Sequence, residues 1–496
     1  MISLRHYQER AVTKAREAFR EGHKAPLLVA PTGAGKTVMF SSISASASGR
    51  GNRIMITAHR FELLDQISKS LDRFDVEHGL ICPGITPNPR ARVQVASVPA
   101  LARRIRKKRF ETDLLVIDEA HHVQPGNSWG QIYEGLGSPP LLGVTASPIR
   151  IGGRGLGISV GGLFDHMINV ISVQELIDEA FLVQPVTYAP AERLDLSGLK
   201  TQSGDFDQTQ LAERVDKPKI TGDAVSHYQQ LCPGVPAVAF GVNIEHCQHI
   251  AEEFRAAGYR FEVVDGSMDA GLRKKLIRGL GREITGLVSC QLIGEGVDIP
   301  AIGCAILLRP TQSLGLHIQQ MGRALRPIYA DGFDLSTVVG RKLALAAAGK
   351  SKAFILDHAG NSLLHGLAET PHEWTLEGIT RARKKAKAAP SLAVKQCEMC
   401  FAVYPSNPIC PYCGHEHVSA REIEAVEGQL QEITPEMAKA ISARKKREVQ
   451  IARTLEQLQA IGRERGYSDE WASHVWASRE RSAQKRLESQ FAAFGR

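Results

Sequence analysis

The strongest constraint on this chain is a short apolar run that leads directly into a glycine-rich loop. Residues 27–29 read LLV, and residues 30–37 read APTGAGKT before a helix-compatible stretch. This order predicts a phosphate-binding P-loop, because glycines let successive backbone N–H groups turn toward an anion at a helix N-terminus. Ala30 stands where the full pattern has glycine, so the later glycines carry the turn. The residues expected to hold a nucleotide's phosphates are Thr32, Gly33, Ala34, Gly35, Lys36 and Thr37.

A pair of carboxylates supplies the second element of this chemistry. The apolar run at 114–117 ends in Asp118-Glu119-Ala120-His121. A carboxylate at the end of a parallel strand is well placed to contact Mg²⁺. We therefore expect Thr37 and Asp118 to hold Mg²⁺ and Lys36 to reach the β- and γ-phosphates of ATP. Glu119 is expected to polarise the attacking water.

Apolar, β-branched runs alternate with amphipathic stretches through residues 1–370, as in a parallel sheet with crossover helices. No apolar run approaches the roughly 18 residues that span a membrane, and the N-terminus is charged at once, so a cytoplasmic protein is expected. The expected divisions are two tandem α/β domains at 1–170 and 216–370, a connector at 171–215, a basic linker at 371–394, a four-cysteine segment at 395–418 and a basic helical tail at 419–496.

Positive charge is concentrated in two places. The net charge is +8, and residues 381–496 hold 20 Lys and Arg against 14 Asp and Glu. A second basic run, RRIRKKR, occupies residues 103–109. Because a polyanion releases counterions to clustered cations, Arg103, Arg104, Lys107 and Lys108 are candidate nucleic-acid contacts. The alternative is a solvated helix face.

Four of the nine cysteines are clustered. Cys397, Cys400, Cys410 and Cys413 form two CxxC pairs separated by nine residues. Two such pairs can present four thiolates to one Zn²⁺, which predicts a zinc ribbon. The other five cysteines are scattered, and this argues against a secreted disulfide framework.

An ordered series of further motifs resembles the superfamily 2 helicases of the DEAD/DEAH-box kind, over roughly residues 1–330. The resemblance implies two RecA-like parallel-sheet domains that bind ATP between them. It places Arg5 and Gln8, in the sequence LRHYQ, at the nucleotide, where Gln8 contacts the adenine. It also implies that His59, Arg60 and Ser97 contact a nucleic-acid strand, because they lie in the segments TAHR and VASV.

The same resemblance supplies residues that couple the nucleotide to domain movement. These are His121 of the acidic tetrad, Thr145 and Ser147 of the segment TASP, and Gln319. Residues 289–300 resemble motif V and place Gly296 and Asp298 near the nucleotide. Residues 319–326, QQMGRALR, resemble motif VI and offer Arg323 and Arg326 as arginine fingers. Either arginine can be the finger, and Gln320 stands where the family usually has arginine.

Within superfamily 2, residues 150–157, 307–313 and 355–361, followed by the cysteine segment, resemble the RadD-type DNA-repair helicases of bacteria and related phage helicases. This implies a DNA helicase or translocase of repair, recombination or phage replication, which uses ATP and Mg²⁺ and holds Zn²⁺ in its cysteine segment. Its expected partners are single-stranded, forked or duplex DNA, and repair or replication proteins at the tail. The alternatives are an RNA helicase with the same motor, a non-hydrolysing nucleic-acid clamp, or the motor subunit of a restriction-type complex.

Overall fold

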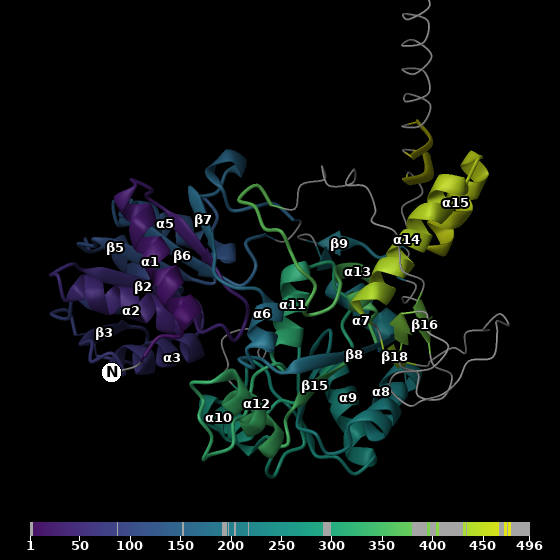
Figure 1. Ribbon diagram of the computed structural model, residues 1–496. Coiled ribbons are helices and arrows are strands. Elements are labelled where there is room, and N and C mark those ends of the chain that lie inside the picture. The colour runs from purple at the N-terminus through teal and green to yellow at the C-terminus, as the bar shows by residue number, and fades with distance from the viewer. Residues whose placement is uncertain are drawn as a thin grey trace, which may run out of the picture.

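The chain builds two seven-stranded sheets, one in each of two α/β domains (Figure 1). The structure was obtained as a computed structural model. It describes residues 3–86, 88–150, 153–190, 196, 198–202, 205–216, 218–290, 299–378, 394–396, 403–405, 430–432, 434–465, 471–473 and 475–477.

The first sheet has the strand order β3-β4-β2-β5-β6-β1-β7, and every neighbouring pair is parallel. Its strands are β1 (Pro26–Val29), β2 (Ile54–Ala58), β3 (His78–Ile81), β4 (Val93–Ser97), β5 (Leu114–Asp118), β6 (Leu141–Thr145) and β7 (His166–Asn169). Strands β1, β2, β5 and β6 are buried along their whole length, which explains their continuous apolar sequences.

Helices cover both faces of this sheet. The helices of the first domain are α1 (His6–Arg20), α2 (Lys36–Ser48), α3 (Phe61–Asp72), α4 (Val98–Ile105) and α5 (Ser128–Gly135), followed by α6 (Val173–Asp178). Side chains of α1, α2 and α3 join one hydrophobic cluster with one face of the strands. Side chains of α4 and α5 join another cluster with the opposite face. The resulting three layers are the architecture expected from the strand and helix alternation.

The second sheet has the order β12-β13-β11-β14-β15-β8-β18, parallel except for the β8–β18 pair. Its strands are β8 (Gln184–Pro190), β11 (Ala237–Phe240), β12 (Phe261–Val263), β13 (Gly286–Ser289), β14 (Cys304–Leu307), β15 (Lys352–Asp357) and β18 (Leu430–Glu432). Strand β8 comes from the segment expected to be a connector, and β18 from the expected tail. Both therefore belong to the second sheet, because backbone pairing with β15 and then β8 extends its edge.

The helices of the second domain are α7 (Gln208–Val215), α8 (Pro218–Leu231), α9 (Ile244–Ala256), α10 (Ala270–Gly279), α11 (Leu314–Gly322), α12 (Val338–Ala347) and α13 (Asn361–His365). One hydrophobic cluster continues from α1 and β1 of the first domain to α11 and β14 of the second. The two domains therefore share buried apolar contacts.

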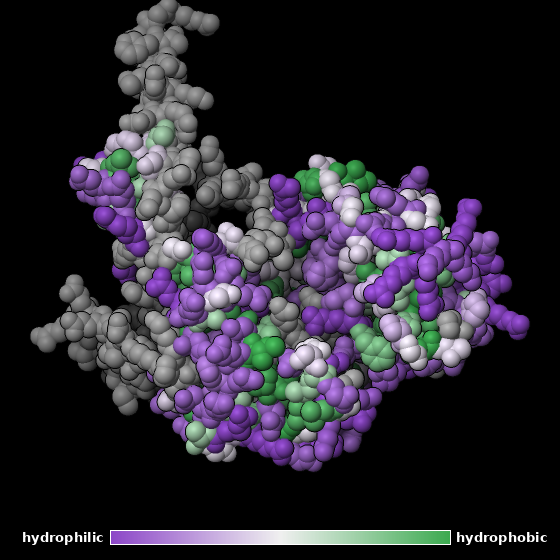
Figure 2. Space-filling model, turned by 180° about the vertical axis from the view of Figure 1, so that it is seen from behind, coloured by the Kyte–Doolittle hydropathy of each residue, from purple (hydrophilic) through white to green (hydrophobic). Residues whose placement is uncertain are grey.

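Shorter elements complete the described structure. They are the 3-10 turns η1 (Ala120–His122) and η2 (Ile158–Val160), the hairpins β9 (Thr201–Gln202) with β10 (Asp205–Phe206) and β16 (Val394–Gln396) with β17 (Val403–Pro405), and the helices α14 (Pro435–Ile451) and α15 (Leu455–Glu464). None of the described helices is long and apolar enough to cross a bilayer. Seen from behind, hydrophilic side chains dominate the surface of the first domain, on the right of Figure 2.

Candidate active site and nucleic-acid interface

The loop between β1 and α2 has the backbone that its glycines predict. Gly33 and Gly35 have φ angles of 89° and 79°, in the left-handed region that side chains other than glycine's rarely adopt. A Cβ on Gly33 would lie 2.8 Å from Leu182 Cδ2, and one on Gly35 would overlap Gln8 Nε2. The backbone conformation therefore favours glycine at both positions, and a side chain there would also displace Leu182 or Gln8. The loop delivers Lys36 and Thr37 at the first turn of α2.

Residues of the LRHYQ segment brace this loop directly. Gln8 Nε2 donates to the Ala34 carbonyl oxygen at 3.0 Å, and the Tyr7 hydroxyl donates to the same oxygen at 3.1 Å. Gln8 Oε1 accepts from the Arg5 backbone N–H at 3.0 Å. The Arg5 side chain donates to the Tyr7 hydroxyl at 3.0 Å. Arg5 and Gln8, both predicted at the nucleotide, thus reach the P-loop together.

An aromatic ring that the sequence analysis did not single out supports this corner. The Phe181 ring lies between two guanidinium groups, with Arg5 Cζ at 4.1 Å and Arg341 Cζ at 4.0 Å from its centroid. Arg341 also donates to the Glu179 carbonyl oxygen at 2.8 Å. Because Arg341 belongs to the second domain and Arg5 to the first, this ring ties both domains to the segment between them. No local motif marks Phe181 or Arg341, so this pair could not be predicted from sequence.

Lys36, Asp118 and Glu119 converge beside the loop. Lys36 Nζ donates to the Ala30 carbonyl oxygen at 3.4 Å. Burial lowers the pKa of Lys36, while Glu119 and Asp118 oppose that shift and Arg323 and Arg326 add to it. The Lys36 ammonium therefore lies within the electrostatic reach of both domains.

Asp118 is a buried carboxylate, 3% exposed, at the carboxyl end of β5. Burial and, next in size, the charge of Glu119 together raise the pKa of Asp118 to about 7, against the opposing effect of Lys36. A bound divalent cation would favour the charged form instead. Mg²⁺ prefers carboxylate and hydroxyl oxygens, so Asp118 with Thr37 fits this ion.

Glu119 is held in an uncommon conformation. Its φ of 52° lies in the left-handed region, and its backbone N–H donates to Asp118 Oδ1 at 3.0 Å. The side chain is largely buried, at 8% exposed for the residue. A non-glycine residue in this region costs on the order of 1–3 kcal/mol and is concentrated at functional sites.

A polar chain leads from Glu119 to the loop after β6. His121 Nδ1 lies 3.4 Å from Glu119 Oε2 and 3.0 Å from Thr145 Oγ1. Thr145 Oγ1 donates to the Ser147 carbonyl oxygen at 3.1 Å and accepts from the Ser147 N–H at 3.2 Å. A Cβ on Gly315 would lie 2.9 Å from Ser147 Oγ. The predicted coupling residues of the first domain therefore form one connected set that ends against α11.

Helix α11 brings the second domain to the nucleotide loop. A Cβ on Gly322 would lie 2.9 Å from Thr32 Cβ, so these two segments touch. Gln319 and Arg323 are both 4% exposed, whereas Arg326 is half-buried. Of the two arginines, Arg323 lowers the pKa of Lys36 more strongly. Of these two charges, Arg323 is therefore the one that acts more strongly on the Lys36 ammonium.

The predicted nucleic-acid residues fall into two groups. His59 and Arg60 follow β2 and Ser97 ends β4, where Ala58 pairs with Ser97. They therefore share the carboxyl edge of the sheet with Asp118. Arg60 Nε donates to His59 Nε2 at 3.1 Å. The basic residues Arg103, Arg104, Lys107 and Lys108 instead line a pocket near the amino ends of β2 and β4.

The remaining predicted residues lie outside the described part of the chain. They are Gly296, Asp298 and the four cysteines Cys397, Cys400, Cys410 and Cys413. Within the described ranges, no group of three or more His, Cys, Asp or Glu side chains is arranged to hold a metal ion. The zinc ribbon therefore stays a prediction from the cysteine spacing.

Two family models match the chain. The model described as "Type III restriction enzyme, res subunit" matches residues 1–150, and that described as "Helicase conserved C-terminal domain" matches residues 226–327. The first range contains the P-loop, the acidic tetrad and the strand-contact segments, and the second contains Arg323 and Arg326.

Similar proteins extend this match over most of the chain. A 51.5 kDa protein of Lactococcus phage (isolate 7-9) is 31% identical over 418 residues, which are 83% of this chain and 83% of the phage protein. Saccharomyces cerevisiae IRC3, named as an ATP-dependent helicase, is 29% identical over 349 residues, 65% of this chain and 49% of IRC3. A solved fragment from Vibrio vulnificus YJ016, described as an HsdR subunit of a type I restriction enzyme, has a TM-score of 0.55 at 22% identity and covers 74% of this chain and 67% of the fragment. At that identity the likeness shows the fold alone.

Proposed function

The chain belongs to superfamily 2 of the helicases, and we propose that it is an ATP-dependent DNA helicase or translocase, which couples hydrolysis to movement on DNA or to its unwinding. Its two helicase domains imply an ATP-hydrolysing enzyme that depends on nucleic acid. The observation that carries the proposal is the convergence of Lys36, Asp118 and Glu119 with α11, where Gly322 abuts Thr32. A site completed by two domains can respond to ATP by closing and to hydrolysis by opening.

In this proposal each residue of the site has one role. Lys36 and the backbone of Gly33–Gly35 bind the phosphates, and Arg5 and Gln8 order the loop at the adenine side. Thr37 and Asp118 would hold Mg²⁺, which neutralises phosphate charge when bound. Glu119 orients the attacking water and accepts its proton. Arg323 is our candidate for the finger that stabilises charge on the transferred phosphoryl group, because it lies at the end of α11 and affects the pKa of Lys36 more than Arg326 does.

Coupling follows from the chain of contacts between Glu119 and α11. A change at Glu119 is transmitted through His121 and Thr145 to Ser147, whose hydroxyl lies against Gly315. The strand-contact residues His59, Arg60 and Ser97 stand at the same sheet edge as Asp118. Closing and opening of the domains can therefore change the grip on a strand that runs along this edge.

DNA is our proposed substrate, for two reasons. First, the family model that matches residues 1–150 is described as the res subunit of a type III restriction enzyme. The segments resembling RadD-type and phage helicases further favour a role in DNA repair, recombination or phage replication. An RNA helicase is the rival substrate class, since a motor of this kind contacts mainly the backbone.

The test is steady-state ATPase activity of the purified protein, alone and with single-stranded DNA, duplex, fork and RNA of matched length. We expect strong stimulation by DNA and little by RNA. Stimulation by RNA alone would overturn the proposed substrate. Absence of stimulation by any nucleic acid would contradict a self-sufficient motor and favour a motor subunit that needs a protein partner.

We also propose that Cys397, Cys400, Cys410 and Cys413 bind one Zn²⁺. Metal analysis of the purified protein should give one zinc per chain. The variant Cys397→Ser with Cys400→Ser should lose that zinc and keep motor ATPase activity. Full zinc content in this variant would contradict the assignment.

A further inference from the structure

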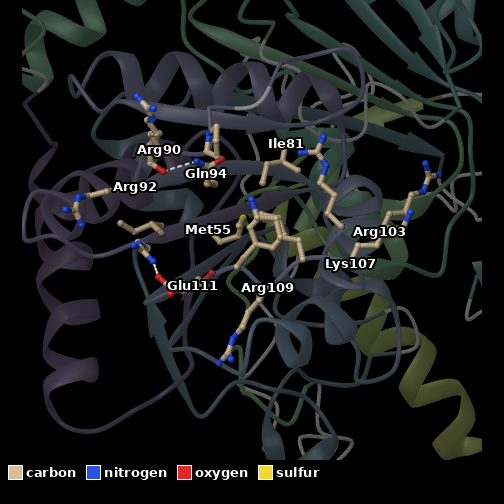
Figure 3. A pocket seen from close by; sticks show the side chains of 17 residues that line it. Met55, Ile81, Arg90, Arg92, Gln94, Arg103, Lys107, Arg109 and Glu111 are labelled. Atoms are coloured by element: carbon tan, nitrogen blue, oxygen red, sulfur yellow. Dashed lines mark hydrogen bonds and ion pairs between the residues drawn. The ribbon is translucent and has the colours of Figure 1, made fainter.

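A basic pocket of about 990 Å³ lies in the first domain, between the end of α4 and the segments that lead into β2, β4 and β5. Of the 17 residues that line it, eight are Lys or Arg and one is an acid, Glu111. Figure 3 shows Met55 and Ile81 at the centre, with Arg90 and Arg92 on one side and Arg103 and Lys107 on the other. The pocket is therefore an apolar floor ringed by cations.

Little of this positive charge is neutralised by the protein. Glu111 forms an ion pair with Arg53, and Arg92 donates to the carbonyl oxygen of Gly51. Among the residues that the structure describes, no carboxylate lies within ion-pair distance of Arg103, Lys107 or Arg109. Like charges that face one concavity repel one another, so an anionic ligand would lower the free energy of this arrangement.

The pocket is remote from the strand-contact residues. Arg53 precedes β2 and His59 follows it, six residues apart along an extended strand, which spans about 20 Å at ~3.3 Å per residue. Likewise, Arg92 precedes β4 and Ser97 is its last residue. One strand gripped at the carboxyl edge therefore does not fill the pocket.

The cationic surface is also larger than one bound anion would need. A second hollow of about 440 Å³ shares Lys107, Lys108 and Arg109 with the first and adds Arg106 and one acid, Glu134. Two adjoining hollows that share their cations suit a series of phosphates along a backbone better than one isolated phosphate. Long arginine and lysine side chains suit sequence-independent backbone contact.

We propose that this pocket is a second nucleic-acid site, which binds the phosphate backbone of a DNA segment separate from the strand held at the carboxyl edge. The inference rests on the proposed function and deepens it. It predicts that the motor contacts DNA at two places, so that a long strand or a duplex binds more tightly than a short strand that reaches the carboxyl edge alone.

The test compares the triple variant Arg103→Gln, Lys107→Gln and Arg109→Gln with a control of equal charge change. The control is Lys14→Gln, Arg20→Gln and Arg73→Gln, three exposed cations of the same domain outside the pocket. DNA affinity is measured by fluorescence anisotropy over a series of salt concentrations. Loss of three single-strand phosphate contacts should reduce the slope of log K against log salt by about 2. The control should keep the wild-type slope.

Three outcomes separate this inference from the proposed function. Wild-type protein that neither binds DNA nor hydrolyses ATP in response to it would overturn both. Normal binding and stimulation, with an unchanged slope in the triple variant, would overturn the second site alone. Hydrogen exchange gives a local measurement: long DNA should protect residues 103–112, and protection by pyrophosphate but not by DNA would make the pocket a small-anion site and overturn the inference.

Discussion

Glu62, at the start of α3 in the first domain, accepts a hydrogen bond from Arg273 of α10 in the second domain at 2.5 Å. The side chains are 24% and 14% exposed, so water screens the pair only in part. Glu62 also lies two residues after Arg60, the last residue of the strand-contact segment. This ion pair therefore connects domain closure to the edge where a nucleic-acid strand is expected.

Arg273→Ala should weaken closure of the two domains. The pair contributes about 1 kcal/mol, which corresponds to about a fivefold change in the closure equilibrium. We expect KM for ATP to rise by up to this factor while the thermal stability of each domain is unchanged. The exchange of Glu62→Arg with Arg273→Glu should restore KM. Arg260→Ala, which removes an ion pair inside the second domain, is the control.

If Arg273→Ala leaves KM unchanged and the exchanged pair behaves like either single variant, Glu62 and Arg273 do not contribute to closure.

Gly322→Ala should impair hydrolysis without abolishing nucleotide binding. The added methyl group would lie 2.9 Å from Thr32 Cβ, closer than such atoms normally approach, so α11 and the P-loop must move apart. Displacement of a catalytic group by this order of distance lowers kcat by about tenfold to a hundredfold. Gly266→Ala is a matched control, because nothing lies within 4 Å of its Cβ position.

Stopped-flow measurement of labelled ATP binding, alongside kcat, checks this expectation. A Gly322→Ala enzyme with wild-type kcat would show that the contact between Gly322 and Thr32 is not required for hydrolysis.

Lys36→Ala and Glu119→Gln should affect different steps. Removal of the Lys36 ammonium leaves the phosphates without their nearest cation, so both ATP binding and turnover should be lost. The Glu119 amide keeps the shape of the carboxylate but cannot accept the proton of water, so ATP should remain bound while kcat falls by about 10²- to 10⁴-fold. Filter binding of labelled ATP distinguishes the two, with Lys14→Ala as the exposed control. ATPase activity that survives both changes would exclude this site.

The parts of the fold that sequence could predict are those with a local cause. The glycines and lysine of residues 30–37 mark the P-loop by themselves, and the buried strands β2, β5 and β6 are short apolar runs. The place of strands β8 and β18 could not be predicted in this way. They pair at the edge of the second sheet although they lie about 240 residues apart in the sequence. The secondary-structure propensity of a segment carries no information about which distant strand it will pair with.

The position of the basic run at 103–109 in the fold likewise could not be predicted from its local sequence. Its composition indicates an anion contact, but its position depends on chain direction: α4 follows the carboxyl end of β4 and returns the chain to the amino end of β5. A crossover helix between parallel strands always makes this return. Topology therefore separates Arg103 and Lys107 from Ser97, although the two sets are close in sequence.

Three buried histidines of the second domain should make its stability fall in mild acid. Burial lowers the pKa of His317 to about 4, of His246 to about 4 and of His358 to about 3. In the unfolded chain these imidazoles titrate near ~6.5. Between about pH 6.5 and pH 4 the unfolded state therefore binds protons that the folded state does not. Each histidine then lowers the free energy of unfolding by up to about 1.4 kcal/mol per pH unit as the pH falls.

The measurement is the free energy of unfolding by urea at a series of pH values, with tryptophan fluorescence and circular dichroism as probes. His317→Gln should flatten the loss of stability between pH 6.5 and 4. His249→Gln is a control of opposite sign, because Asp216 raises the pKa of His249 and its protonation favours the folded state. Its removal should steepen the loss instead. Identical pH profiles for the wild type and His317→Gln would show that His317 is protonated as readily in the folded chain as in the unfolded one.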